Sequence, residues 1–174
     1  MTIHSEHPFL PPEGDRNAVR RVRGRMPLPV SVWASVDDGR RVGWTVSSVL
    51  VADGEPPELL GLLDEDSELA DVLPRSRTLA VSLLGGPHQF LADAFAGLAP
   101  APGGAFRLGS WRDTAWGPVL VDAPAWLGVR VAGGEIDHAG WTLLVRGTIE
   151  HAEVTDEAET VLGYLRGRYR HLDL

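Results

Sequence analysis

Three hydroxyl side chains lie close together in the segment 43–48, which reads Gly-Trp-Thr-Val-Ser-Ser. Thr45 and Ser47 alternate with apolar neighbours, a pattern typical of a strand with one buried and one accessible face. Hydroxyl groups on an accessible face can both donate and accept hydrogen bonds, so this segment is suited to a polar cofactor. The sequence therefore places a candidate binding site on this strand.

The motifs of common hydrolytic and metal-dependent sites do not occur in the chain. It has no Gly-x-Ser-x-Gly, no His-Glu-x-x-His and no glycine-rich phosphate loop. It has no cysteine, which excludes disulfides, thiolate metal ligands and cysteine nucleophiles. All 16 basic residues are arginine, which also excludes a lysine Schiff base. We therefore expect no metal site and no nucleophile-based hydrolase.

One histidine has a neighbour that could assist it. Asp137 and His138 follow Gly133-Gly134 and precede a predicted strand that begins at Gly140. A histidine beside an aspartate in a turn can form a hydrogen-bonded pair at the surface, or it can act in catalysis or binding at a site. These residues alone leave both interpretations open.

Short apolar runs separated by glycine and proline must position these side chains, and they predict a mainly β domain. The expected strands span residues 29–36, 42–51, 58–63, 78–84, 118–121, 125–131 and 140–150. Their spacing favours an antiparallel barrel. The proline- and glycine-rich stretch 99–104 is expected to be a surface loop.

Three short helices are expected between or after the strands. The first is capped by Asp66 or Ser67, continues through the next turn and stops at Pro74. The second, 87–96, has a proline in its first turn and a glycine after its end. The third, 155–164, has acidic residues in its first turn, as the helix dipole favours.

Length and composition bound the organisation of the chain. With 174 residues and 44% hydrophobic content, one well-buried domain is expected. Residues 1–16 are predicted to form a flexible arm and residues 17–174 the domain. The chain has no signal-peptide pattern and no apolar run near the roughly 20 residues of a membrane span, so a cytoplasmic protein without membrane contact is expected.

Charge is unevenly distributed along the sequence. The formal net charge of -8 argues against nucleic acid as a partner. Five arginines nevertheless crowd residues 16–25, whereas residues 53–71 contain eight carboxylates and no basic side chain. The simplest interpretation of both segments is solvated surface.

The segment 43–48 resembles the Gly-x-Thr-x-Ser-Ser signature of the flavin reductase-like FMN-binding split barrels. Other stretches resemble family motifs in the same order: 79–84 a Phe-Ala-Val-Asn-x-Leu strand, 91–97 a Leu-Ala-x-x-Phe-Ala helix, 116–120 a Gly-x-Pro-x-Leu turn and 164–172 a closing Tyr-x-Arg-Gly-Arg-Tyr-x-x-Leu. Asp137-His138 resembles a Gly-Asp-His element whose glycine is Ile136 here. The resemblance covers about residues 18–172.

This resemblance implies a six-stranded antiparallel Greek-key split barrel with short helices, which forms a homodimer and binds FMN, or FAD, in a groove between subunits. It implies hydride transfer from NAD(P)H to the flavin, which a flavin-dependent monooxygenase could then use. Two alternatives stay open: a non-catalytic FMN-binding protein for storage or sensing, and a split barrel that has lost its cofactor.

The resemblance also implies roles for particular residues. His138 is expected on the nicotinamide side as the catalytic residue. The expected cofactor-binding residues are Trp44, Thr45, Val46, Ser47, Ser48, Ser67, Ser82, Asp137, Arg168 and Tyr169.

The chain departs from the family pattern at several of these places. Where the family has Pro-Thr-Gly-Val, residues 27–30 read Pro-Leu-Pro-Val, and Ser82 replaces an asparagine. The helix start that helps to hold the phosphate is acidic here, at 64–68, and carboxylates there would repel a phosphate dianion. Compensation is expected from Arg75 and Arg77, or from an N-terminal arginine of a second subunit.

Overall fold

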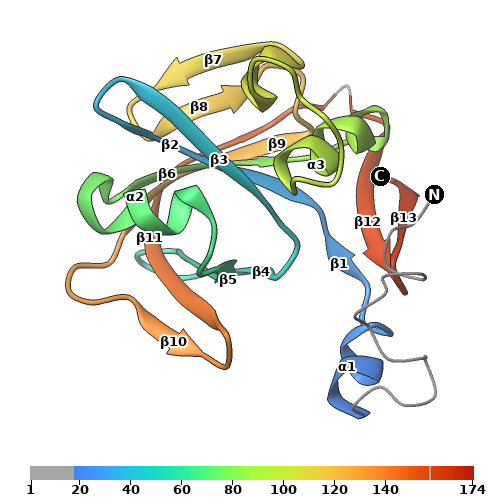
Figure 1. Ribbon diagram of the computed structural model, residues 1–174, viewed down its shortest axis with the longest axis horizontal. Helices are drawn as coiled ribbons and strands as arrows, with labels where there is room; N and C mark the ends of the chain where they lie inside the picture. Colours follow the sequence, from blue (N-terminus) through green and yellow to red (C-terminus); the bar gives the residue numbers. More distant parts are fainter. Residues whose placement is uncertain (1–17, 157) are drawn as a thin grey trace.

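The computed structural model describes residues 18–156 and 158–174, and within them the chain is mainly β (Figure 1). A large antiparallel sheet curls around an apolar interior, and two smaller sheets and two of the helices lie against it. In spatial order the large sheet contains β3 (Arg40–Val46), β2 (Ser31–Asp37), β6 (Thr78–Leu83), β9 (Ala125–Val131), β11 (Thr142–Val154), β5 (Glu58–Asp64) and β4 (Val49–Ala52), with β10 (Asp137–Ala139) paired to β11.

The smaller sheets and the helices complete the described chain. One small sheet contains β1 (Leu28–Pro29), β12 (Thr160–Leu165) and β13 (Arg168–Asp173), and the other contains β7 (Trp111–Thr114) and β8 (Gly117–Leu120). The helices are α1 (Ala18–Arg23), α2 (Glu68–Ser76) and α3 (Gln89–Phe95), with short 3-10 turns η3 (Gly86–His88) and η4 (Ala105–Arg107). No helix among the described residues has the length and apolar character that crossing a membrane requires.

The core of the large sheet is built around Trp33, whose side chain is fully buried. The indole ring fits against β5 because residue 61 is glycine: a Cβ there would lie 2.4 Å from a ring carbon of Trp33. Apolar side chains of α2, including Leu69 and Leu73, close this core from one side. A second apolar cluster forms beneath α3 and reaches β12 through Leu162.

The expected mainly β, antiparallel architecture is confirmed, but the number of strands differs from six. The described part of the large sheet has seven strands in its path and β10 beside it. One reason is that the predicted strand 42–51 is broken at Ser47 and Ser48 into β3 and β4. The break turns the chain so that β4 pairs with β5 instead of extending the hairpin with β2.

The predicted helix 155–164 is wrong. Residues 160–165 form β12, which pairs with both β1 and β13. The acidic residues that favoured a helix start precede the strand, whereas Leu162 is buried in the second core cluster. Pairing with two strands outweighs the local helix signal there, because tertiary packing overrides weak propensities.

Two smaller differences concern the ends of elements. α2 does not stop at Pro74 but continues to Ser76, and the backbone N–H of Arg77 donates to the carbonyl of Leu73. Additional short elements, α1, β7, β10 and β13, have too few residues to produce a clear periodic signal. The predicted arm, residues 1–16, lies outside the described residues.

Candidate functional site

The break between β3 and β4 places the two serines of the Gly-Trp-Thr-Val-Ser-Ser segment on a partly exposed surface. Two contacts set this position. Thr45 Oγ1 donates to the carbonyl of Ala92 in α3 over 2.8 Å. The carbonyl of Ser48 accepts from the backbone N–H of Leu62 in β5 over 2.9 Å. The end of β3 is therefore held between α3 and β5, with Ser47 and Ser48 at the point where the strand turns.

The apolar residues of the same segment belong to the core. Val46 is 4% exposed, and Trp44 is partly buried and packs against the first core cluster. The carbonyl of Val46 accepts a hydrogen bond from Ser31 Oγ over 2.7 Å. The alternation seen in the sequence is thus present in space, with apolar side chains inward and hydroxyl groups on the other side.

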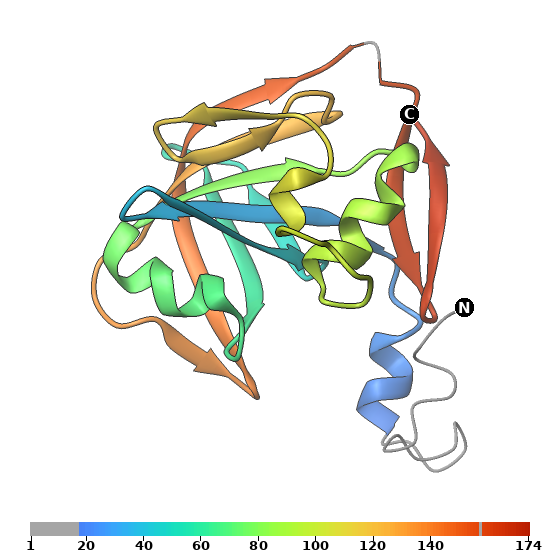
Figure 2. The same ribbon diagram turned by 45° about the horizontal axis from the view of Figure 1, so that its top comes forward.

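Arg23, at the end of α1, reaches this site. Its Nη2 atom lies 3.4 Å from Ser48 Oγ. The hairpin formed by β12 and β13 supports the end of α1, since the backbone N–H of Arg166 donates to the carbonyl of Gly24 over 2.9 Å. Figure 2 shows the tip of this hairpin beside α1.

The same hairpin brings Tyr169 toward α3. Its hydroxyl donates to Asp93 Oδ1 over 2.8 Å, and its ring lies edge-on to that of Tyr164 with centroids 5.3 Å apart. Burial, followed by the hydrogen bond to Asp93, raises the pKa of Tyr169 well above its ordinary value. Burial also raises the pKa of Tyr164, and the nearby Arg23 guanidinium opposes that rise. Arg168, beside them in the sequence, is exposed.

Asp137 and His138 lie on β10, beside the start of α2. Both are exposed, and His138 Nδ1 is 3.4 Å from Glu65 Oε2. β5 runs between this region and the serines: the backbone N–H of its Leu62 donates to the carbonyl of Ser48, and it ends at Asp64, next to Glu65. In the sheet, β11 lies between β10 and β5, so β11 and β5 both separate His138 from Ser48.

Ser67 and Ser82 are each 1% exposed and hydrogen-bonded inside the fold. Ser67 Oγ donates to the carbonyl of Asp64 and accepts from the backbone N–H of Ala70, which makes it the N-cap of α2. Ser82 Oγ accepts from the backbone N–H of Leu120 over 3.0 Å. Both hydroxyl groups thus hold the fold together and are not on the accessible surface with Ser47 and Ser48.

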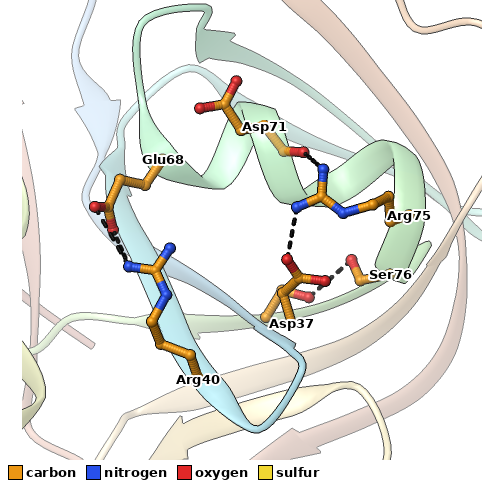
Figure 3. Close-up of polar contacts among 7 residues, drawn as sticks. Asp37, Arg40, Glu68, Asp71, Arg75 and Ser76 are labelled. Carbon is orange, nitrogen blue, oxygen red and sulfur yellow. Dashed lines mark hydrogen bonds and ion pairs between the residues drawn. The ribbon is translucent and has the colours of Figure 1, made fainter.

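Ion pairs link both ends of α2 to the hairpin of β2 and β3 (Figure 3). Arg75 Nη2 lies 2.6 Å from Asp37 Oδ2, and Arg40 Nη1 lies 3.3 Å from Glu68 Oε2. The hydrogen bond from Arg75 lowers the pKa of Asp37. Arg77 donates to backbone carbonyls of the connection between β9 and β10. Arg75 and Arg77, expected to compensate the acidic segment for a phosphate, are therefore already engaged elsewhere.

The sequence did not indicate that Asp93 and Arg23 belong to the candidate site. Asp93 occupies an unspecified position of the Leu-Ala-x-x-Phe-Ala helix, and its one signal in the sequence is that it is the only charged residue between Leu91 and Phe95. Arg23 belongs to the N-terminal arginine cluster, from which a contribution by a second subunit was expected. The structure instead brings Arg23 of the same chain to Ser48.

The arrangement suits an organic polar ligand better than a metal ion. In the part of the chain that the structure describes, no three His, Asp or Glu side chains gather as a metal site. Ser47 and Ser48 are partly exposed, Arg23 contacts Ser48, and Arg23 is also near Tyr164, whose ring packs on that of Tyr169. Hydroxyl groups, a guanidinium and aromatic rings are the groups that hold a flat, polar nucleotide such as a flavin.

Comparison with known proteins identifies the class. Residues 23–173 match the family model described as "Flavin reductase like domain". An FMN reductase (NADH) RutF of Methylorubrum populi is 30% identical over 173 residues, which cover 99% of this chain and 83% of that protein. A 4-hydroxyphenylacetate 3-monooxygenase reductase component of Pseudomonas aeruginosa is 28% identical over 160 residues, 91% of this chain and 93% of that one.

A solved structure agrees in fold. Flavin reductase PheA2 in its native state superposes with a TM-score of 0.81 at 22% identity, over 92% of this chain and 99% of that one. The chain belongs to the flavin reductase-like family. This membership confirms the resemblance drawn from the ordered motifs and the class of enzyme it implied, a flavin oxidoreductase.

Proposed function

We propose that this protein binds FMN at the surface formed by Ser47 and Ser48 and transfers hydride to it from NAD(P)H. When bound, the flavin would accept the two electrons that are transferred as hydride. The chain's own residues bind and orient the reactants, which is the main requirement of this chemistry. One observation carries the assignment: the two serines lie partly exposed at a strand break that α3 and β5 hold in place.

The residues take separate roles in this proposal. Ser47 and Ser48 hold the ring edge through hydroxyl and backbone groups, and Thr45, whose hydroxyl is bonded to Ala92, through its backbone. Tyr169 and Arg168 take part from the hairpin of β12 and β13. His138, with Asp137, faces the incoming nicotinamide from β10, on the far side of β11. The names of the similar proteins, an FMN reductase (NADH) and a monooxygenase reductase component, support both the reaction and delivery of reduced flavin to a monooxygenase.

We further propose that the protein acts as a homodimer, as the family resemblance implies. Size-exclusion chromatography with light scattering tests this. A mass of twice 18.8 kDa is the expected result, and a monomeric mass at micromolar concentration would contradict it.

The test of function is the absorption spectrum of the purified protein, followed by NADH and NADPH oxidation with and without added FMN. We expect a bound-flavin spectrum and steady oxidation of the nicotinamide. A flavin spectrum without oxidation would instead identify a binding or storage protein. Absence of flavin binding at micromolar FMN would identify a barrel that has lost its cofactor.

A further inference from the structure

The tip of the hairpin formed by β10 and β11 carries the most exposed large apolar side chain that the structure describes, Trp141, which is 78% exposed. Ala139 pairs with Thr142, so Gly140 and Trp141 form a two-residue turn, in which Gly140 has a φ of 65°. Turns of this kind favour glycine, asparagine and aspartate. A tryptophan gains little burial here, so the fold of its own chain does not account for its presence.

Two contacts hold Trp141 in place. Thr142 Oγ1 donates to the carbonyl of Ala139 over 2.8 Å and closes the turn. The guanidinium of Arg20, on α1, lies over the indole with its central carbon 5.5 Å from the ring centroid. A cation over the face of an indole is attracted by the quadrupole of the ring. Because Trp141 is still 78% exposed with Arg20 in place, the opposite face of the ring is open to a ligand.

α1 also links Trp141 to the serine segment. Arg23 Nη2 lies 3.4 Å from Ser48 Oγ, and Arg20 precedes Arg23 by about one helical turn, roughly 4.5 Å along the helix axis. Figures 1 and 2 agree that α1 and the hairpin of β10 and β11 project from the same end of the large sheet. One short helix therefore joins the two positions, an arrangement suited to a ligand with two separate rings.

Trp141 and Arg20 together have the chemistry of a site for an aromatic base attached to phosphate. An open indole face stacks on a flat base through its π system. The guanidinium adds positive charge and hydrogen-bond donors, which suit phosphate oxygens. Residues 18–25 contain four arginines and no carboxylate, so no acidic neighbour in this segment neutralises the charge.

We propose that Trp141 and Arg20 form a subsite for an adenine nucleotide, with the adenine stacked on the open face of the indole and its phosphates beside the guanidinium. The inference rests on the proposed function, because it takes hydride transfer to occur at Ser47 and Ser48. Two reactants of that function carry an adenosine phosphate, namely NAD(P)H and FAD. FMN has no adenine and does not use the subsite.

Binding of ADP-ribose to the full chain tests the subsite directly, since this probe has the adenine and the phosphates but neither a flavin nor a nicotinamide ring. Its dissociation constant is measured by isothermal titration calorimetry. Trp141→Ala is expected to weaken binding at least about fivefold, the lower end of the effect of removing a stacking ring, and Trp141→Phe to retain most of the affinity. Phe90→Ala, which removes another exposed ring, on α3, is the matched control and should bind as the wild type does.

A second variant tests the charged half of the subsite. Arg20→Gln is expected to weaken ADP-ribose binding about threefold or more at low salt and by less at high salt, because dissolved ions screen exposed charges. Arg21→Gln makes the same charge change on the same helix and should leave the affinity unchanged. An equal loss in both variants would attribute the effect to net charge and overturn the assignment of Arg20.

Two further measurements identify the reactant that uses the subsite. If it is NAD(P)H, Trp141→Ala raises KM for NADH without changing kcat, and KM for reduced nicotinamide mononucleotide, which lacks adenine, stays the same. If it is FAD, the same variant weakens binding of FAD but not of FMN. Either result supports the subsite.

The subsite and the proposed function fail in different ways. A wild-type protein that neither binds flavin nor oxidises NADH, yet binds ADP-ribose through Trp141, would remove the function and leave a nucleotide site. No binding of ADP-ribose at millimolar concentration, or equal binding by Trp141→Ala and the wild type, would overturn the subsite whatever the activity. If Trp141→Ala instead changes the mass measured by light scattering and leaves ADP-ribose affinity unchanged, the exposed indole belongs to a contact between copies of the chain.

Discussion

Tyr169 donates its hydroxyl hydrogen to Asp93 Oδ1 over 2.8 Å, and this bond ties β13 to α3 across 76 residues of sequence. The bond lies next to the end of β3, because the residue before Asp93, Ala92, accepts from Thr45 Oγ1. The closing hairpin, α3 and the serine segment are thereby linked into one unit. Disturbing any of the three is expected to affect the candidate site.

The first prediction concerns the ionisation of the two tyrosines. The chain contains two tyrosines, Tyr164 and Tyr169, so the absorbance of phenolate reports on this pair alone. Burial raises both pKa values, so half-ionisation is expected clearly above the ordinary value of 10.0. A titration midpoint at the ordinary value in the folded protein would contradict the packing of this hairpin.

The same shift has a consequence for stability. A neutral group whose folded pKa is raised contributes stability that is fully present below the unfolded pKa and is lost as pH rises through the folded pKa. The free energy of unfolding is therefore expected to fall above about pH 10, the ordinary tyrosine value. In Tyr169→Phe the fall should be smaller, although this variant should be less stable at neutral pH by about 1 kcal/mol for the lost hydrogen bond. Urea unfolding at pH 7 and above pH 10 measures both effects.

The second prediction concerns the contact of Gly61 with Trp33. A Cβ at residue 61 would lie 2.4 Å from the indole ring and 2.9 Å from the carbonyl of Ser48. Gly61→Ala is therefore expected to destabilise the protein by about 1–3 kcal/mol, the usual cost of overpacking a core, and to weaken flavin binding by moving Ser48. Gly133→Ala is the control, because a Cβ there would meet nothing within 4 Å. Equal stability of the two variants would contradict the close packing of β5 on Trp33.

The third prediction separates structural from ligand-binding serines. Ser82→Ala leaves the buried N–H of Leu120 without its partner and is expected to cost about 1–3 kcal/mol of unfolding free energy. Its flavin affinity should stay the same. The double variant Ser47→Ala, Ser48→Ala should show the reverse, with near-normal stability and at least about tenfold weaker FMN binding. Unchanged FMN affinity in the double variant would remove these serines from the site.

The fourth prediction concerns His138, which β11 and β5 separate from the serines. Its contact to Glu65 is at the exposed surface, so His138→Asn is expected to leave the fold and the flavin dissociation constant intact. If it faces the nicotinamide, kcat/KM for NAD(P)H should fall about tenfold, which equals roughly 1.4 kcal/mol of transition-state stabilisation. His171→Asn on β13 is the control. An equal loss in both variants would argue against a specific role for His138.

Local patterns in the sequence were sufficient for much of the fold. Alternation in the run 42–46 predicted a half-buried strand, and Ser67 was one of two residues expected to cap α2; both agree with the structure. These features depend on neighbours a few residues away, so they can be read without knowing the rest of the chain. The order of the motifs, from the serine segment to the closing Tyr-x-Arg-Gly-Arg-Tyr, likewise identified the family.

Contacts between distant residues were decided by the tertiary structure alone. Ser48 and Ser82 looked alike as hydroxyl groups on strands, but Ser82 is buried against Leu120 while Ser48 stands at a strand break beside Arg23. The sequence predicted a helix over residues 160–165, but in the structure they form a strand that pairs with β1 and β13. The sequence by itself thus determined the class of protein and the position of the serine segment, whose backbone pattern is local. Which hydroxyl groups remain accessible, and which arginine reaches them, depended on long-range packing that no local pattern encodes.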